Sequence, residues 1–334
     1  MPIWSEILKE LAPKQNGLPV DFDGVRRKYL LKLHEHSERN VILYASGWLQ
    51  GEAAPTLVSI NDEDIQAFME VSHGLQGDQL DLILHSPGGY PEAAEAIVAY
   101  LRSRFSHIRV IVPQLAMSAA TMIACAADQI VLGKHSFLGP TDPQIMLATP
   151  LGVRSVPAQS VLDQFDRATK ECSDPAKLSA WLPMLSQYGP DLLVQCETAL
   201  EMSKVLVKSW LESYMFKEMD DRKSRAENVS NWLADHMGFK SHSRHIPRKE
   251  LEEHQLSILR LEEDSILQDM SLSVFHATTH TFSGTPAVKI VENHTGRAFI
   301  KQNVSQPVQV AMQPIQSFEI APGPPAIPEQ SADR

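Results

Sequence analysis

The sequence predicts an α/β fold built on a mostly parallel sheet, and two observations support this class. Short apolar runs bounded by polar residues or glycine are typical of buried strands, and four occur: NVILYASG (40–47), LDLILH (80–85), HIRVIVP (107–113) and QIVLG (129–133). Between consecutive runs, apolar residues recur at helical spacing or small residues predominate. Strands that alternate with helices in this way indicate parallel pairing with helical crossovers.

The first elements follow the same patterns. Residues 1–20 predict a short amphipathic helix that ends near Pro13 and Gly17, and 23–37 predict a second helix. The strand at 40–47 comes next. Asn61 or Asp62 can then cap a helix that continues to Val71 before the strand at 80–85.

Pro91 stands at the start of the next helix, where its missing N–H costs nothing, and that helix continues to Phe105. The strand at 107–113, a small-residue segment at 116–127 and the strand at 129–133 follow.

The C-terminal half has weaker patterns. Residues 150–180 are less regular, whereas an apolar stripe over 190–219 predicts a long amphipathic helix. Residues 222–270 are charged and predicted helical, with a possible strand at 256–261, and AVKIVEN (287–293) predicts one more strand. The domain organisation predicted is an N-terminal helical extension (1–21), a main core (22–220), a C-terminal α+β part of the same fold (221–302) and a disordered tail rich in Pro and Gln (303–334).

Composition excludes several function classes. The 334 residues carry 30 Lys and Arg against 41 Asp and Glu, a net charge of −11, which argues against a nucleic-acid binder. The three cysteines, Cys125, Cys172 and Cys196, form no CxxC pair, so neither a disulfide framework nor a zinc knuckle is expected. No secretory leader and no apolar run of membrane-spanning length is found, and we expect a cytoplasmic chain without an intrinsic membrane span.

The first segment that could carry chemistry is ILHSPGGYPEAAEAI (83–97). A strand ends in Pro-Gly-Gly and a helix begins at once. Gly88 and Gly89 permit positive φ and let the backbone approach a ligand, while free N–H groups at the helix start can face negative charge. A tight turn without a ligand would have the same sequence.

The second segment is QLAMSAATMIACAADQIV (114–131), in which small residues surround Ser118 at a predicted strand-to-helix turn. A serine there can expose its hydroxyl while the N–H of Ala119 faces a developing oxyanion. The alternative is that Ser118 is simply a helix N-cap.

The two segments together resemble the Clp/crotonase fold, and within it the Clp-type serine peptidases. The closest likeness is to the serine dehydrogenase proteinase family, which is similar to signal peptide peptidase A and the Clp proteolytic subunit. It rests on 26–48, 81–101, 110–133 and LGPTDPQ (138–144), with a weaker likeness over 239–258. The resemblance covers about 22–300 and is strongest over 80–145.

This resemblance implies a ββα superhelix, a peptide or protein substrate, a homo-oligomer and no cofactor or metal. Ser118 matches the nucleophile. Gly88, with Gly89 beside it, and the N–H of Ala119 match the oxyanion hole. The family commonly has Ser-Ala-Gly where this chain has Ala120 as the third residue.

The general base is not matched in the same way. The histidine position of the Clp proteolytic subunit falls near Pro140, and His135 is expected to end a strand away from the site. Signal peptide peptidases use a downstream lysine, for which Lys170 and Lys177 are the candidates by analogy. A lysine can act as a base only when it is desolvated.

Other polar residues have less specific interpretations. Thr141 and Asp142 could hold the base or shape the substrate groove, although the flanking prolines favour a rigid turn. His242 aligns loosely with a family histidine. It belongs to a group whose spacing fits no metal motif: His236, His242, His245 and His254.

The function expected is therefore that of a serine peptidase acting through an acyl-enzyme. One alternative is an inactive scaffold of the same fold, favoured by Ala120 and the missing histidine. A crotonase-type acyl-CoA enzyme is the other, disfavoured because the residues around the Gly-Gly turn are acidic where coenzyme A phosphates need basic groups.

Overall fold

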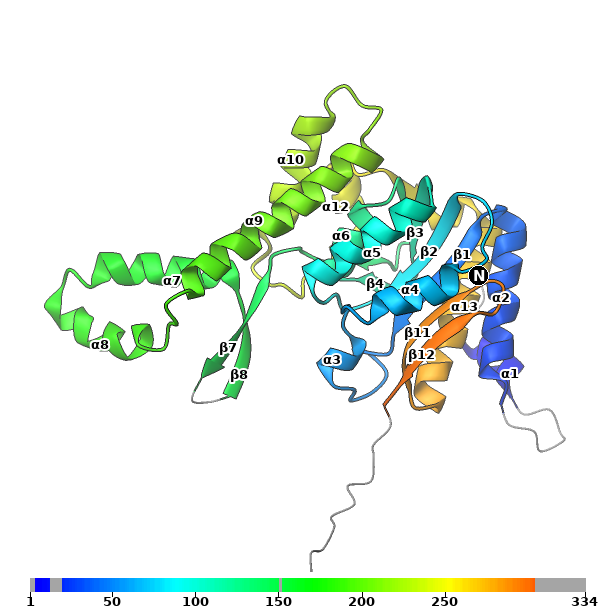
Figure 1. Ribbon diagram of the computed structural model, residues 1–334, viewed down its shortest axis with the longest axis horizontal. Coiled ribbons are helices and arrows are strands. Elements are labelled where there is room, and N and C mark those ends of the chain that lie inside the picture. The colour runs from blue at the N-terminus through cyan, green and yellow to red at the C-terminus, as the bar shows by residue number, and fades with distance from the viewer. Residues whose placement is uncertain (1–3, 13–19, 150–151, 304–334) are drawn as a thin grey trace, which may run out of the picture. The chain divides into compact units, whose positions relative to one another are not determined.

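The computed structural model describes residues 4–12, 20–149 and 152–303, all within one unit of the chain, Met1–Asn303. The tail predicted from residue 303 onward lies, apart from Asn303 itself, outside the described residues. The centre of the fold is a seven-stranded sheet in the order β10-β5-β3-β2-β1-β11-β12 (Figure 1). The strands are β1 (Asn40–Ser46), β2 (Gln79–His85), β3 (His107–Val112), β5 (Gln129–Leu132), β10 (Ile258–Arg260), β11 (Ala287–Asn293) and β12 (Ala298–Gln302).

Five neighbouring strands, from β10 to β1, run parallel, and β11 and β12 add antiparallel pairs at one edge. The predicted α/β class with a mostly parallel sheet is confirmed. Strands β1 and β11 are buried along their whole length, as expected for a sheet covered on both faces.

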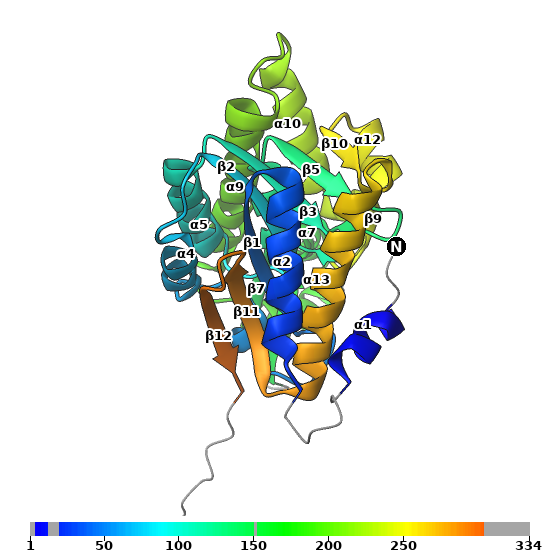
Figure 2. The ribbon, with the colours of Figure 1, turned by 90° about the vertical axis from the view of Figure 1, so that its right-hand side faces the viewer.

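Helices cover both faces of this sheet. On one face, α2 (Phe22–Ser37) and α13 (Ser265–Gly284) lie side by side, with α1 (Trp4–Leu11) against α13 (Figure 2). On the other, the main apolar core includes residues of α4 (Asp64–Ser72), α5 (Pro91–Arg104) and α6 (Ala119–Cys125). The strand side chains alternate between the faces: Leu82 and Leu84 join this core, and Ile83 joins the cluster under α2 and α13.

A second, three-stranded sheet lies at the carboxyl ends of the main strands. It consists of β4 (Leu115–Ala116), β6 (Phe137–Leu138) and β9 (Ile246–Pro247). Strand β6 is parallel to β4 and antiparallel to β9, so that Ala116, Leu138 and Ile246 lie in register. This small sheet aligns three segments that are far apart in the sequence.

Residues 144–210 form more regular structure than the sequence predicts. A hairpin of β7 (Gln144–Thr149) and β8 (Gly152–Pro157) leads into α7 (Ala158–Glu171) and α8 (Pro175–Leu185), and then the long α9 (Leu192–Trp210). We call 144–210 the arm. It has its own apolar cluster, made of α7, α9 and hairpin residues. The prediction of an irregular 150–180 was wrong: β8, α7 and α8 occupy most of these residues, and α7 packs on α9 rather than on the main core.

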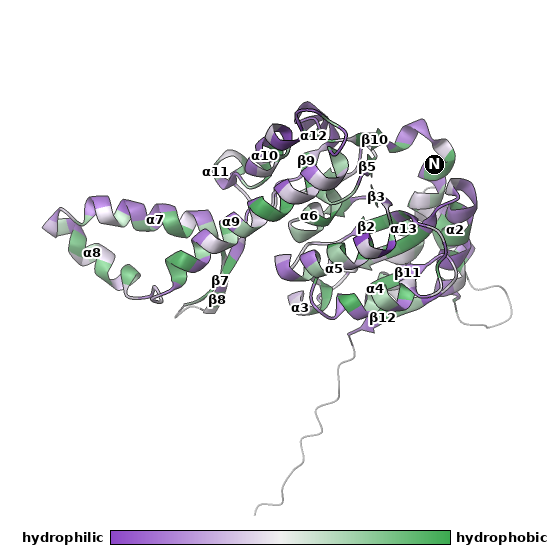
Figure 3. Cartoon of the chain, turned by 45° about the horizontal axis from the view of Figure 1, so that its top comes forward, coloured by the Kyte–Doolittle hydropathy of each residue, from purple (hydrophilic) through white to green (hydrophobic). Residues whose placement is uncertain are grey.

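The long helix predicted at 190–219 is confirmed as α9, which ends in a π-helical turn at Leu211–Met215. The strand considered at 256–261 is present as β10. The remaining elements are α3 (Pro55–Val58), α10 (Arg222–Leu233), α11 (His236–Phe239), α12 (Arg248–Glu253) and a 3₁₀ turn at Leu261–Glu263. In Figure 3, the turn that leads into α10 is coloured mainly hydrophilic. No described helix is long and apolar enough to cross a membrane.

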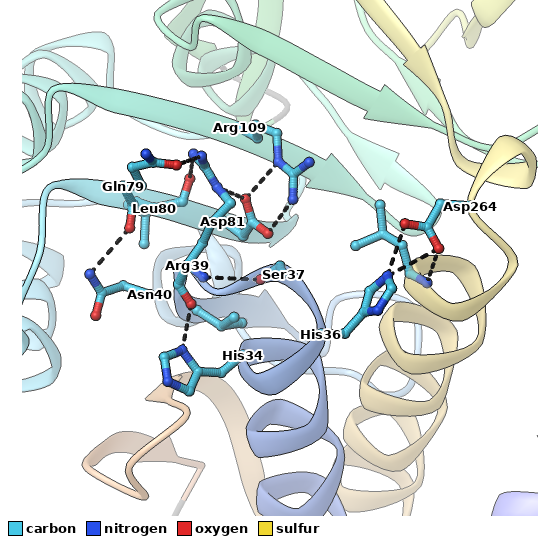
Figure 4. Close-up of polar contacts among 12 residues, drawn as sticks. His34, His36, Ser37, Arg39, Asn40, Gln79, Leu80, Asp81, Arg109 and Asp264 are labelled. Atoms are coloured by element: carbon cyan, nitrogen blue, oxygen red, sulfur yellow. Dashed lines mark hydrogen bonds and ion pairs between the residues drawn. The ribbon is translucent and has the colours of Figure 1, made fainter.

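At the amino ends of the parallel strands, a buried charged cluster ties β1, β2 and β3 together (Figure 4). Asp81 is fully buried. It accepts hydrogen bonds from Arg39 Nε at 2.6 Å and from Arg109 Nε and Nη2 at 2.8 and 2.6 Å. Arg39 also donates to the carbonyls of Leu80 and His107, which secures the same end of the sheet.

Candidate active site

Ser118 lies between β4 and α6, at the carboxyl end of the sheet, where open α/β folds place their ligands. Its backbone has φ 51° and ψ −121°, a conformation that L residues rarely adopt. The hydroxyl does not cap the helix, and no described residue hydrogen-bonds to it. Ser118 therefore stands at the N-cap position of α6 without acting as a side-chain cap, and this partly exposed residue is held on a strained turn.

The helix that follows Ser118 is held in place by small residues. Every residue of α6 is buried, and Ala120 is fully buried in the main core. Thr121 Oγ1 donates to the carbonyl of Ala116 at 2.8 Å and accepts from the N–H of Gly139 at 3.0 Å. The segment after β6 is thereby fastened to the turn that carries Ser118.

The Gly-Gly turn meets Ser118 directly. Gly88 has φ +96°, and a Cβ placed on it would lie 2.7 Å from Ser118 Cβ and 2.9 Å from the amide nitrogen of Ala119. The N–H of Ser86 donates to Leu115 and the N–H of Met117 donates to Ser86, which makes a parallel bridge between the two segments. Two motifs about thirty residues apart in sequence thus form one site.

Backbone amides at this junction differ in their hydrogen bonding. Those of Gly89 and Ala119 have no hydrogen-bond partner among the described residues. The N–H of Gly88 donates to Ser86 Oγ at 3.2 Å. Since Ala119 is the first residue of α6, its free N–H is one of the unpaired donors of a helix start.

Ile60 supports the turn from its other side. Its N–H donates to Gly88 O at 2.8 Å, and its carbonyl accepts from the N–H of Tyr90 at 3.0 Å. The neighbouring Ser59 carbonyl accepts from the fully buried Lys289 at 2.8 Å, and Lys289 also binds Asp64 Oδ1 at 2.7 Å. Burial lowers the pKa of Lys289, but its donors are already used, so it supports the turn rather than offering a base.

The structure does not bring either predicted lysine to Ser118 within one chain. Lys170 lies near the end of α7 and Lys177 near the start of α8, and both are exposed. Figure 1 shows α7 and α8 well separated from α6. Neither ammonium group has the desolvated environment that a lysine base requires.

A different group of ionisable side chains meets on the segment that follows β6, the segment whose Gly139 is hydrogen-bonded to Thr121 of α6. Asp142 is 1% exposed and accepts from His242 Nδ1 at 2.7 Å and from His236 Nδ1 at 2.9 Å. Its chain position is fixed by Thr141, whose N–H donates to Leu233 O at 2.8 Å and whose carbonyl accepts from Ser203 Oγ at 2.7 Å. Asp142 and His242 are each recognisable in the sequence, but 100 residues separate them, so no local pattern pairs them.

The other histidines have structural surroundings. His245 stacks on Phe137 and His254 on Trp232, with ring centroids 5.4 and 3.6 Å apart. Burial lowers the pKa of His135, which lies in the turn between β5 and β6. Within the described ranges, no group of three or more His, Cys, Asp or Glu side chains is arranged to hold a metal ion.

His85 ends β2 directly before the Gly-Gly turn and points away from the main core. It is fully buried, its ring meets Phe275 at a centroid distance of 4.9 Å, and neither ring nitrogen has a partner among the described residues. Burial lowers the pKa of His85 to about 4, so the imidazole is neutral at pH 7.

Comparison with known proteins identifies the family. Residues 54–180, which include the Gly-Gly turn, Ser118 and Lys170, match the model of ClpP-like SDH-type serine proteinases. Uncharacterized protein MJ0137 of Methanocaldococcus jannaschii is 34% identical over 215 residues, covering 63% of this chain and 67% of that protein. Uncharacterized protein MJ1495 of the same organism is 39% identical over 95 residues, 28% of this chain and 30% of that protein.

A solved structure of a ClpP1 point mutant from Listeria monocytogenes shows a structural similarity with a TM-score of 0.32 and 12% identity, over 72% of this chain and 98% of that one. The family match and the identity to MJ0137 show that the chain belongs to the ClpP-like family of SDH-type serine proteinases.

Proposed function

We propose that this protein is a serine endopeptidase in which Ser118 attacks a peptide carbonyl and forms an acyl-enzyme. The observation that carries the proposal is the contact between the Gly88 turn and Ser118, with the free amide of Ala119 beside them. An activated serine next to unpaired amides is the arrangement that acyl transfer needs.

The oxyanion hole is proposed to consist of the N–H of Ala119 and an N–H of the Gly-Gly turn. Gly89 offers a free amide, while that of Gly88 becomes available only if Ser86 Oγ releases it. Each well-placed donor stabilises the tetrahedral intermediate by about 3 kcal/mol. The backbone supplies these donors, so no cofactor is needed.

Two alternative functions can be distinguished from a peptidase by experiment. A crotonase-type enzyme would use the same amides on a thioester, and binding of an acyl-CoA to the purified protein would favour it. An inactive scaffold would keep the fold without the chemistry. The buried Ala120 methyl gives no support to the scaffold, because it packs into the core.

We further propose a cytoplasmic homo-oligomer that assembles through the arm. Helix α8 has no buried residue although most of its residues are apolar, and Figure 3 shows hydrophobic (green) stretches along it. The side chains of Leu178, Leu182 and Met184 are 39%, 55% and 41% exposed. An exposed apolar surface of this kind is typical of an interaction site. Val194 and Val205 of α9 are also exposed, at 62% and 52%.

A fluorophosphonate probe tests the proposed peptidase. Wild-type protein is expected to be labelled covalently, and Ser118→Ala to be unlabelled while retaining its circular dichroism spectrum. Labelling of Ser118→Ala equal to wild type, or no labelling of wild type at any concentration that keeps it folded and assembled, would refute the proposal.

A further inference from the structure

We propose that His242, oriented by Asp142, is the general base that activates Ser118, in place of the lysine that the family resemblance implies. The inference rests on the proposed peptidase function and assigns the general base, which the sequence by itself does not identify. Four observations support it: strand register, hydrogen bonding of the imidazole, exposure of its ring and the placement of the lysines.

The register of the three-stranded sheet places Ser118, Asp142 and His242 beyond the same end of that sheet. Strands β4 and β6 are parallel, and β9 is antiparallel to β6, with Ala116, Leu138 and Ile246 aligned. Ser118 follows Ala116 by two residues, Asp142 follows Leu138 by four and His242 precedes Ile246 by four. Because β9 runs in the opposite direction, all three chain segments leave the sheet at the same end.

Contacts close to Ser118 reinforce this placement. A Cβ on Gly139 would lie 3.2 Å from Met117 Cα, so the start of the 139–142 segment touches the residue before the serine. The hydrogen bond from Gly139 to Thr121 fixes the same segment to α6. Asp142 is three residues further on, about 10 Å of extended chain at most.

Hydrogen bonding to Asp142 selects the useful tautomer. A buried carboxylate accepts from Nδ1–H of His242, which leaves Nε2 with a lone pair and without a partner in the described part of the chain. The Asp142 carboxylate also accepts hydrogen bonds from His236 Nδ1 and, at 3.1 Å, from Gln144 Nε2, so its orientation is strongly constrained. A carboxylate that holds one imidazole in this way is the orienting partner of a general base.

His242 fits the role better than His236. The His242 side chain is 25% exposed and that of His236 12%, so the former can reach a substrate at a partly exposed serine. His236 begins α11 and lies deeper, which suits a residue that steadies the carboxylate. No hydrogen bond joins His242 to Ser118 here, as is common before substrate is bound.

The proposed proton path balances at each step. His242 Nε2 takes the Ser118 hydroxyl proton as Oγ bonds to the carbonyl carbon, and delivers it to the amide nitrogen as the C–N bond breaks. Water then attacks the acyl-enzyme, gives its proton to Nε2, and that proton returns to Ser118 when the acid product leaves.

The test compares rates of fluorophosphonate labelling in full-length variants. His242→Ala and Asp142→Asn are expected to label at least about 100-fold more slowly than wild type, the usual size of a general-base effect. Added imidazole should restore part of the rate of His242→Ala, which loss of a purely structural histidine would not allow. His236→Gln should slow labelling less, and His254→Gln, at a partly exposed histidine that stacks on Trp232 and has no contact with Asp142, should leave the rate per folded molecule unchanged.

Each remaining outcome is decisive. A wild-type rate in His242→Ala, or a loss that imidazole does not restore in a variant with a native thermal midpoint, overturns the inference. If Lys170→Ala with Lys177→Ala abolishes labelling instead, a lysine is the base and the peptidase proposal stands. If His242→Ala does not fold, the isosteric His242→Gln replaces it for the rate comparison. A wild-type protein that is never labelled refutes the proposed function itself.

Discussion

At the scale of single residues, Ser118 has a positive φ although it carries a side chain. Glycine would fit this conformation without strain, and serine is retained there at a cost of about 1–3 kcal/mol. The surrounding contacts, above all those with the Gly88 turn, must therefore hold the residue in place. Strain of this kind at a site indicates that the hydroxyl itself is required.

Replacing Ser118 by glycine or alanine distinguishes the backbone strain at this position from the reactivity of the hydroxyl. Ser118→Gly is expected to be more stable than Ser118→Ala by about 1 kcal/mol, because only glycine relieves the positive φ. Neither variant should react with a fluorophosphonate. Urea unfolding measures the difference, and equal stabilities would show that the turn is not strained.

Buried histidines make stability depend on pH. The pKa of His85 is lowered to about 4, below the ordinary 6.5, and burial also lowers the pKa of His276 to about 4. In the unfolded chain these groups take up protons below about pH 6.5, whereas the folded protein does not until about pH 4. The contribution of these histidines to stability is therefore fully present above pH 6.5 and is lost as the pH falls towards 4.

His85→Phe is expected to flatten this dependence, because phenylalanine binds no proton in either state and fits beside Phe275 and Trp48. The shift of His85 corresponds to at most about 3 kcal/mol between pH 6.5 and 4. Thermal midpoints of both proteins at several pH values measure the effect. An unchanged slope in His85→Phe would contradict the assigned protonation.

At the scale of elements, the charged cluster of Arg39, Asp81 and Arg109 fixes the amino ends of three strands, opposite the edge that carries Ser118 (Figure 4). A buried charge cluster often marks a functional site. Here both carboxylate oxygens are already paired and the cluster belongs to the strands themselves, so its role is structural.

Asp81→Asn is expected to destabilise the protein by about 3 kcal/mol, since it removes the charge that two guanidinium groups require. Molecules that remain folded should still be labelled at Ser118. Denaturant unfolding combined with labelling per folded molecule tests this. Lost labelling in fully folded protein would place the cluster in the active site instead.

At the scale of the whole molecule, the proposed assembly depends on the apolar surface of the arm. Leu182→Glu places a charge on the exposed apolar part of α8 and should lower the mass measured by light scattering, with little effect on the fold. Thr169→Glu, an exposed polar position on α7, is the matched control. An unchanged mass in Leu182→Glu would exclude α8 from the interface.

Features of the fold could be predicted from the sequence when the residues that determine them lie close together in the chain. Local patterns were enough for the strands at 40–47 and 80–85, for the helix from Pro91 and for the Gly-Gly turn, because apolar periodicity, proline and glycine act within a few residues. They failed for 150–180, where α7 buries its apolar side chains against α9 within the arm and α8 leaves its apolar side chains exposed. They also missed β12, an edge strand with partly exposed side chains.

Sequence by itself determined the mostly parallel α/β architecture and the two segments that contain Ser118 and Gly88, since both follow from residue types a few positions apart. Tertiary structure alone decided that these segments touch, that Lys170 and Lys177 lie on the arm away from them, and that Asp142 binds His236 and His242. The reason is that partners about a hundred residues apart are chosen by strand register and packing, which no local pattern of residues encodes.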